Sequence, residues 1–295
     1  MSEMDAPIRA GFIGLGAMGL PMAQRLARHR CLTHVWNRTG TIAAQLAQDC
    51  GITAAVTPAE LAAHVEQILI CVSRDADVLT VVDAILPALK PGTVVIDFST
   101  IGCSTAALIG ERIRQRGGDF LDIPVSGGVE GARTGQLVMM AGGCSATLAR
   151  VRPLLDHLGT RLVHFGDNGQ GQAAKAVNQV MAAGINQAVT EALALGARAG
   201  LDMDPLIDLL AGGAAGNWFL QKRGKTMIQG QYPPGFKLAL HHKDLTLCET
   251  LATALDITIP LASQTRQDYQ RLMDRGFADE DISALYRLKQ PTENP

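Results

Sequence analysis

A glycine-rich turn near the N-terminus constrains this chain more than any other feature. Residues 8–13 form an apolar run that predicts a short buried strand, and the apolar spacing of residues 18–28 predicts a helix. The glycines between them follow the pattern G-x-G-x-x-G, in which the first permits a tight turn, the second admits a pyrophosphate and the third lets helix and strand pack closely. The helix N-terminus adds free N–H groups and a partial positive charge. We therefore expect a dinucleotide site rather than a plain surface loop, formed by Gly14, Gly16, Ala17, Met18 and Gly19.

The rest of the first half alternates between strand and helix patterns. Residues 67–72 and 93–98 are continuous apolar runs, as expected for strands that are covered on both faces. Helical patterns follow them over residues 76–90 and 104–116. This alternation predicts an open, mostly parallel, doubly wound sheet. Other strands are expected at residues 32–36, 120–122, 137–141 and 161–165.

The pattern changes after residue 166, where strand patterns almost disappear and long helical stretches replace them. We therefore expect a cofactor-binding domain over residues 1–166 and an all-helical domain over residues 167–295. The helical pattern of residues 173–199 is longer than most helices of globular proteins, so a single helix can connect the two domains.

Composition excludes several kinds of function. The 295 residues include 28 acidic and 26 basic side chains, and the net charge of -2 without a basic cluster argues against nucleic-acid binding. Residues 1–7 lack the apolar core of a signal peptide, and no apolar run reaches the ~18 residues of a membrane span. The six scattered cysteines contain no C-x-x-C pair, which favours the cytoplasm. His241 and His242 are adjacent and lack a third ligand at metal spacing, so we expect no metal site.

The end of the second predicted strand bears on the choice of cofactor. Sites that prefer NAD usually place Asp or Glu there, to accept a hydrogen bond from the ribose 2′-hydroxyl. Here the position holds Asn37, followed by Arg38 and Thr39. Asn37 does not repel a 2′-phosphate, and Arg38 can pair with one. We expect these three residues to contact the cofactor and NADP to be preferred over NAD, although a solvated arginine at a strand end is the alternative.

A second glycine pair follows a serine in the middle of the chain. Ser126 offers a hydroxyl, and Gly127 and Gly128 expose backbone N–H groups, so the three residues can hold a carboxylate. A plain loop is the alternative interpretation.

The predicted connecting helix carries a polar face near its start. Lys175 shares this face with Asn178 and Gln179 by its spacing, and alanines flank all three. A lysine in such a restricted place can give a proton or a hydrogen bond to a developing alkoxide, whereas most helical lysines are solvated. Farther along, Trp218 either walls a pocket or packs between helices.

These motifs together resemble the β-hydroxyacid dehydrogenases, which include 3-hydroxyisobutyrate dehydrogenase and tartronate semialdehyde reductase. Residues 11–22, 122–143 and 169–179 carry the resemblance, and it extends over nearly the whole chain. It implies a Rossmann-like N-terminal domain with a mostly parallel sheet, and an all-α C-terminal domain that completes the active site. It also implies a homodimer or a homotetramer.

The resemblance further implies roles for individual residues. Lys175 is expected to be the general acid and base, with Asn178 and Gln179 orienting the substrate. Ser126, Gly127 and Gly128 are expected to hold the substrate carboxylate, and Trp218 to line its pocket. Further cofactor contacts are expected from Val72, Ser73, Thr100, Lys243 and Asp244. Many members have two asparagines where this chain has Asn178 and Gln179, so the chain looks more like the tartronate semialdehyde reductase branch.

We therefore expect an NAD(P)-dependent oxidoreductase that interconverts a small 3-hydroxy acid and its semialdehyde. Imine reductases resemble the chain in architecture but usually lack a lysine at the position of Lys175. The 6-phosphogluconate dehydrogenases also resemble it, but they are much longer and need basic residues for a phosphate. A protein that binds NAD(P) without catalysis has no use for a proton donor at this position.

Overall fold

The computed structural model describes residues 9–290 and divides into two compact units, residues 1–175 and 176–295. The division falls between Lys175 and Ala176, within the long helix α8 (Gln170–Arg198). The expected boundary between domains at residue 166 stays a prediction. The expectation that residues 1–7 are not a signal peptide concerns residues outside the described range. No helix within residues 9–290 is long and apolar enough to cross a membrane.

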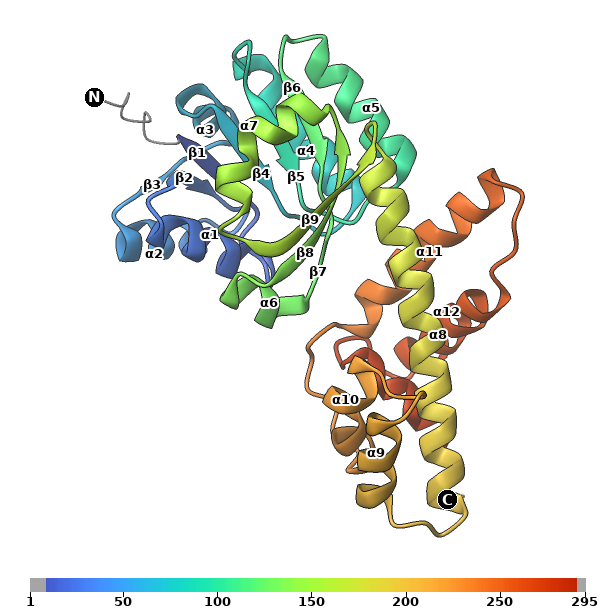
Figure 1. The fold of residues 1–295 in the computed structure, drawn as a ribbon. Helices are drawn as coiled ribbons and strands as arrows, with labels where there is room; N and C mark the ends of the chain where they lie inside the picture. Colours follow the sequence, from blue (N-terminus) through green and yellow to red (C-terminus); the bar gives the residue numbers. More distant parts are fainter. Residues whose placement is uncertain (1–8, 291–295) are drawn as a thin grey trace. The chain divides into compact units, whose positions relative to one another are not determined.

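The first unit is built on one nine-stranded sheet in the order β3-β2-β1-β4-β5-β6-β8-β7, with β9 paired to β8 (Figure 1). All pairs from β3 to β6 are parallel, as is β8 with β9, while β8 runs antiparallel to β6 and β7. The strands are β1 (Ala10–Ile13), β2 (Leu32–Trp36), β3 (Thr53–Ala54), β4 (Gln67–Ile70), β5 (Val94–Asp97), β6 (Asp119–Asp122), β7 (Val125–Ser126), β8 (Leu137–Gly143) and β9 (Gly159–Gly166). The predicted mostly parallel sheet is confirmed.

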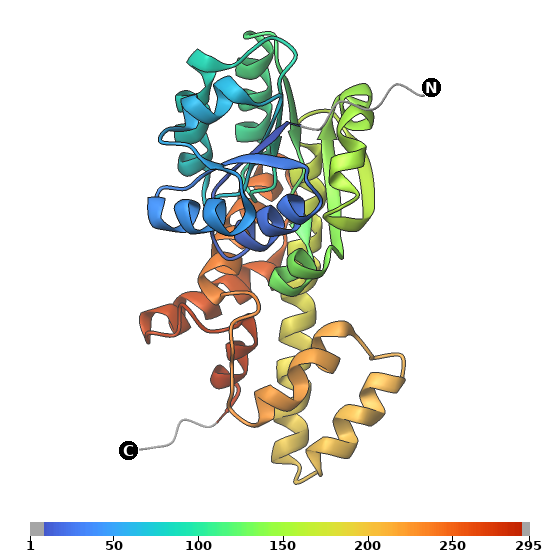
Figure 2. The same cartoon turned by 90° about the vertical axis from the view of Figure 1, so that its left-hand side faces the viewer.

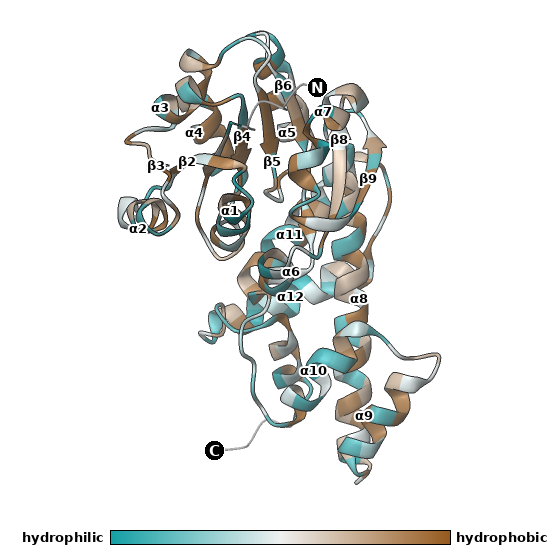
Figure 3. Cartoon of the chain, turned by 60° about the vertical axis from the view of Figure 1, so that its left-hand side comes forward, coloured by the Kyte–Doolittle hydropathy of each residue, from teal (hydrophilic) through white to brown (hydrophobic). Residues whose placement is uncertain are grey.

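Helices cover both faces of this sheet, which Figure 2 shows from the side. They are α1 (Gly19–Arg28), α2 (Gly40–Cys50), α3 (Pro58–His64), α4 (Asp75–Ile85), α5 (Cys103–Arg114), α6 (Gly128–Thr134) and α7 (Ser145–Leu155), with a short 3-10 turn η1 (Leu86–Ala88). Successive strand residues serve opposite cores: Phe12 packs with the α1 side, and Ile13 packs with the α3 side. The central strands are therefore apolar throughout, as the brown colour of β4 and β5 shows in Figure 3.

The structure departs from the sequence pattern at two helices of this unit. The pattern of residues 76–90 predicts one helix, but α4 ends at Ile85 and a 3-10 turn containing Pro87 follows, because proline cannot donate the next helical hydrogen bond. The stretch after Ser126 resembles a loop in sequence, but Gly128 begins α6. Its glycines have low helix propensity, so local sequence alone hides this helix.

The second unit is helical, as predicted, and has a separate core. After α8 it contains α9 (Met203–Gly212), α10 (Trp218–Ile228), α11 (Leu238–Ala254), α12 (Pro260–Asp274) and the 3-10 segment η2 (Ile282–Leu288). Leu193 of α8, Leu245 of α11 and Tyr269 of α12 are among the fully buried side chains that join these helices. The predicted helical second half is confirmed.

Candidate active site

The glycine turn connects β1 to α1 at the carboxyl edge of the sheet. Gly14 has a φ of +95°, and a Cβ there would lie 2.3 Å from the Cys71 carbonyl oxygen. A Cβ on Gly19 would lie 1.9 Å from the Gly14 carbonyl oxygen, so helix and strand touch at this point. Gly16 is exposed, and a Cβ there would meet no atom within 4 Å. The turn is closed toward the protein and open toward solvent, which suits a pyrophosphate against the backbone.

The start of α1 favours an anion. Its first turn contains no acidic residue, and no side chain caps it at Met18. The N–H groups and the positive end of the helix dipole therefore face the turn without a competing carboxylate of their own helix. These features fit the dinucleotide that the sequence predicts.

Of the residues after β2, Asn37 bonds to the glycine turn and Arg38 points to solvent. Asn37 accepts a hydrogen bond from the Leu15 backbone N–H at 2.9 Å, and its amide nitrogen donates to the Thr39 carbonyl at 3.1 Å. The Arg38 side chain is 89% exposed and lies 3.7 Å from the half-buried Asp77 carboxylate. Because such an exposed ion pair is weak, the guanidinium can turn to a phosphate at low cost.

The ends of β4 and β5 lie beside this turn, since both strands run parallel to β1. The backbone N–H of Val72 donates to the Ser99 hydroxyl at 2.9 Å, which ties the segment after β4 to the segment after β5. Ser73 is exposed next to Val72, and Thr100 follows Ser99. Val72, Ser73 and Thr100 thus share one edge of the sheet with the glycine turn.

Lys175 lies at the end of the first unit and is only 7% exposed. Its ammonium nitrogen donates to the Val125 carbonyl at 2.9 Å. Val125 directly precedes Ser126, so this bond brings the predicted acid and the predicted carboxylate-binding stretch together. Gly127 and Gly128 have φ values of +128° and +62°, which favour glycine at both positions.

A buried carboxylate fixes the start of the lysine helix. Asp122, at the end of β6, accepts hydrogen bonds from the backbone N–H groups of Gly169 at 2.8 Å and Gln172 at 3.0 Å. Burial raises the pKa of Asp122, although these two hydrogen bonds oppose the shift. Sequence reasoning did not identify Asp122 or Gln172, because neither the strand pattern nor the helix pattern shows which groups meet in three dimensions.

The second unit holds another set of predicted residues in a continuous chain of contacts. Asn178 donates to the Gln179 side-chain oxygen at 2.8 Å, and Gln179 donates to Asp244 at 2.7 Å. Asp244 forms an ion pair with Lys243 at 3.0 Å. Trp218 is placed differently: it begins α10, is largely exposed, and has the Arg223 guanidinium 5.8 Å from its ring centroid.

Of the adjacent histidines in α11, His241 lies in the core of the second unit. His241 is fully buried, with Nδ1 3.1 Å from the Tyr269 hydroxyl and Nε2 3.3 Å from the Gln179 carbonyl. Within residues 9–290, no group of three or more His, Cys, Asp or Glu side chains is arranged to hold a metal ion.

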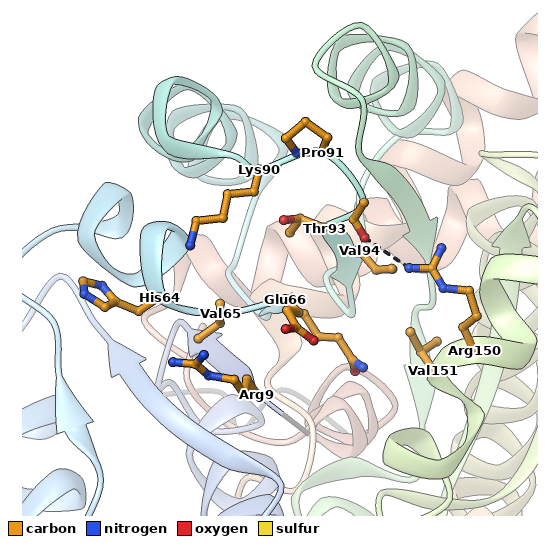
Figure 4. Close-up of a pocket in the computed structure, with 12 residues that line it drawn as sticks. Arg9, His64, Val65, Glu66, Lys90, Pro91, Thr93, Val94, Arg150 and Val151 are labelled. Atoms are coloured by element: carbon orange, nitrogen blue, oxygen red, sulfur yellow. Dashed lines mark hydrogen bonds between the residues drawn. The ribbon is translucent and has the colours of Figure 1, made fainter. Parts of the chain in front are cut away.

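A separate cavity of about 560 Å³ lies at the opposite, amino edge of the sheet (Figure 4). Arg9, Lys90 and Arg150 contribute cationic groups to it, and Glu66 contributes a carboxylate. None of the predicted site residues lines it. Since dinucleotides bind at the carboxyl ends of parallel strands, this cavity does not belong to the cofactor site.

Comparison with known protein families covers both halves of the chain. A model described as the NAD binding domain of 6-phosphogluconate dehydrogenase matches residues 9–166. A second model, described as the NAD-binding domain of NADP-dependent 3-hydroxyisobutyrate dehydrogenase, matches residues 169–289.

Individual relatives match over nearly their full length. The 2-hydroxy-3-oxopropionate reductase of Escherichia coli (strain K12) is 36% identical over 290 residues, which cover 97% of this chain and 99% of the relative. The mitochondrial 3-hydroxyisobutyrate dehydrogenase of Mus musculus is 31% identical, with coverage of 99% and 90%. A solved structure of 3-hydroxyisobutyrate dehydrogenase from Mycobacterium tuberculosis with L-serine has a TM-score of 0.89 at 30% identity, covering 97% of this chain and all of that one.

Proposed function

The chain belongs to the β-hydroxyacid dehydrogenase family, and on that premise we propose that Lys175 is its general acid and base in the interconversion of a small semialdehyde and its 3-hydroxy acid. The chain is an NAD(P)-dependent oxidoreductase that acts on CH–OH groups, as its relatives are. The observation that supports the proposal most is the buried ammonium group of Lys175 beside the Ser126 stretch.

The cofactor, when bound, supplies or accepts the hydride. The glycine turn would hold its pyrophosphate, because Gly16 leaves the backbone accessible and α1 presents its positive end. Arg38 would pair with the 2′-phosphate of NADP, since its guanidinium is exposed and Asn37 adds no negative charge beside it. NADP is therefore the proposed preference.

Lys175 would transfer the proton to and from the substrate oxygen. In the reduction it would donate a proton to the carbonyl oxygen as negative charge develops there, and in the oxidation it would remove the proton from the hydroxyl. Its hydrogen bond to the Val125 carbonyl holds the ammonium group beside Ser126. Asn178 and Gln179, on the next turn of the same helix, would orient the substrate.

The substrate would be a small acid whose carboxylate binds at Ser126, Gly127 and Gly128. The Ser126 hydroxyl and the backbone N–H groups of the glycines are donors of the right kind for a carboxylate. By analogy with the Escherichia coli relative, tartronate semialdehyde (2-hydroxy-3-oxopropionate) is the first substrate to test. Trp218 is the further proposed substrate contact, and Lys243 and Asp244 are further proposed cofactor contacts.

We also propose that the enzyme works in the cytoplasm as a homodimer or homotetramer. The six cysteines are scattered along the sequence without a C-x-x-C pair, which supports a reducing compartment. Val177, Met181 and Leu195 expose apolar side chains along α8, which offers surface for subunit contacts.

The proposal is tested by initial rates of NADPH and NADH oxidation with tartronate, methylmalonate and succinic semialdehydes and with glyoxylate. Turnover of at least one acid, faster with NADPH, is the expected result. Faster turnover with NADH would refute the role of Arg38. Turnover only of imines, with none of the aldehyde acids, would refute the proposed substrate class.

A further inference from the structure

A single buried side chain, Gln172, connects the lysine helix to the loop that follows β5. Its side chain is only 2% exposed. Its carbonyl oxygen accepts a hydrogen bond from the Ile101 backbone N–H at 3.1 Å, and its amide nitrogen donates to the Ser99 carbonyl at 2.8 Å. The two bonds flank Thr100, the residue expected near the nicotinamide.

The backbone of Gln172 is fixed as well. Its N–H donates to the Asp122 carboxylate at 3.0 Å, and that carboxylate also accepts from Gly169 at 2.8 Å. Gly171 adds close packing, since a Cβ there would lie 2.4 Å from the Asp122 carbonyl oxygen and 2.5 Å from that of Met140. The first turn of α8 is therefore held directly against the end of β6 and the middle of β8.

Lys175 follows Gln172 by three residues, so the two side chains are neighbours on the helix surface. We infer that Gln172 is a positioning residue that sets the proton donor, Lys175, relative to the Ser99–Thr100–Ile101 loop, which is expected to lie near the nicotinamide. This inference rests on the proposed function. Its physical basis is that misplacement by about 1 Å costs on the order of 100-fold in rate.

An amide makes both side-chain bonds at any pH. Glutamine has one acceptor and one donor group, which match the Ile101 N–H and the Ser99 carbonyl. Methionine has a similar shape but makes neither bond. Ionised glutamate would place an oxygen against the Ser99 carbonyl, whereas protonated glutamate carries one donor and one acceptor and can restore both bonds.

The first test compares Gln172→Met with Gln170→Met. Gln170 is in the same turn but is exposed, so the second variant controls for the same chemical change without loss of the buried bonds. We expect Gln172→Met to lower kcat by about 10- to 100-fold and to raise the primary deuterium isotope effect with NADPH deuterated at the transferred position. Folded Gln172→Met enzyme with unchanged kcat and isotope effect, or an equal loss in Gln170→Met, would overturn the inference.

The second test uses Gln172→Glu, which keeps the inference falsifiable if Gln172→Met does not fold. We expect its kcat relative to wild type to rise at least about tenfold as the pH falls from 8 to 5.5, because protonation of the new carboxyl restores the donor to Ser99. Assays well below both melting temperatures exclude unfolding as the cause. A ratio that does not change with pH would contradict the inference.

Both tests remain distinct from the test of the proposed function. They measure hydride transfer with whichever substrate the enzyme accepts, so a wrong substrate assignment leaves them intact. A Lys175→Ala enzyme with full activity would refute the role of the lysine and the inference with it, whereas an impaired Lys175→Ala enzyme beside an unchanged Gln172→Met enzyme would refute the inference alone.

Discussion

At the residue scale, cofactor preference depends on one exposed guanidinium. The Arg38 side chain is largely exposed, and its contact with the Asp77 carboxylate is long, at 3.7 Å. Asn37 is already engaged with Leu15 and Thr39. In this account, Arg38 therefore supplies the positive charge that favours the 2′-phosphate of NADP over the 2′-hydroxyl of NAD.

We predict that Arg38→Gln lowers kcat/KM for NADPH by about 10- to 100-fold, which corresponds to the ~1.5–3 kcal/mol of a hydrogen bond to a charged group. The value for NADH should change by less than about threefold, because NADH has no 2′-phosphate. Arg28→Gln, an exposed change at the far end of α1, is the matched control. Equal losses with both cofactors would contradict the assignment.

At the scale of elements, the second and third glycines of the turn have different constraints. Gly19 touches the Gly14 carbonyl, whereas Gly16 faces open space. We predict that Gly19→Ala lowers the free energy of unfolding by about 1–3 kcal/mol, because the added carbon overpacks the contact between α1 and β1. Chemical denaturation measures this change.

Gly16→Ala should behave differently. We predict that it changes the free energy of unfolding by less than about 0.5 kcal/mol, as expected for an exposed position. It should weaken NADPH binding by at least about tenfold, because the new methyl group occupies the place of the pyrophosphate. An alanine at position 16 that leaves NADPH affinity unchanged would place the pyrophosphate elsewhere.

The sequence predicts well those elements that are determined by residues close together in the chain. Buried parallel strands such as β4 and β5 are continuous apolar runs, and the glycine turn has its own fixed spacing. The role of Lys175 as acid and base, expected from its helix face and from the family resemblance, stays a prediction. The buried bonds of Asp122 and Gln172 could not be predicted, because they join segments that are about 50 and 70 residues apart in sequence and leave no periodic pattern.

At the scale of the whole molecule, the two units have separate cores, and a network of buried polar groups belongs to the second. Asn186 donates to the Tyr269 hydroxyl at 2.8 Å, and this hydroxyl lies 3.1 Å from Nδ1 of His241. Since Asn186 is the donor in the first bond, the hydroxyl proton is directed to His241, whose Nε2 then faces the Gln179 carbonyl. Burial also raises the pKa of Tyr269 far above its usual range, so the hydroxyl stays protonated.

We predict that Tyr269→Phe lowers the free energy of unfolding by about 1–3 kcal/mol, because it removes the buried hydroxyl that accepts from Asn186 and lies 3.1 Å from Nδ1 of His241. NADPH affinity, which depends mainly on the glycine turn and Arg38 in this account, should change by less than about threefold. Tyr232→Phe is the control, since the Tyr232 hydroxyl is buried without a hydrogen-bond partner among the described residues. A Tyr269→Phe enzyme as stable as Tyr232→Phe would show that the network does not stabilise the second unit.

The most direct test of the central claim is the rate of the hydride-transfer step in NADPH-saturated Lys175→Ala enzyme, with tartronate semialdehyde as substrate. We predict a fall of about 10²- to 10⁴-fold, as expected for loss of a general acid, with NADPH affinity within about threefold of wild type. Added methylamine should restore part of the rate. A Lys175→Ala enzyme that transfers hydride at the wild-type rate would contradict the account.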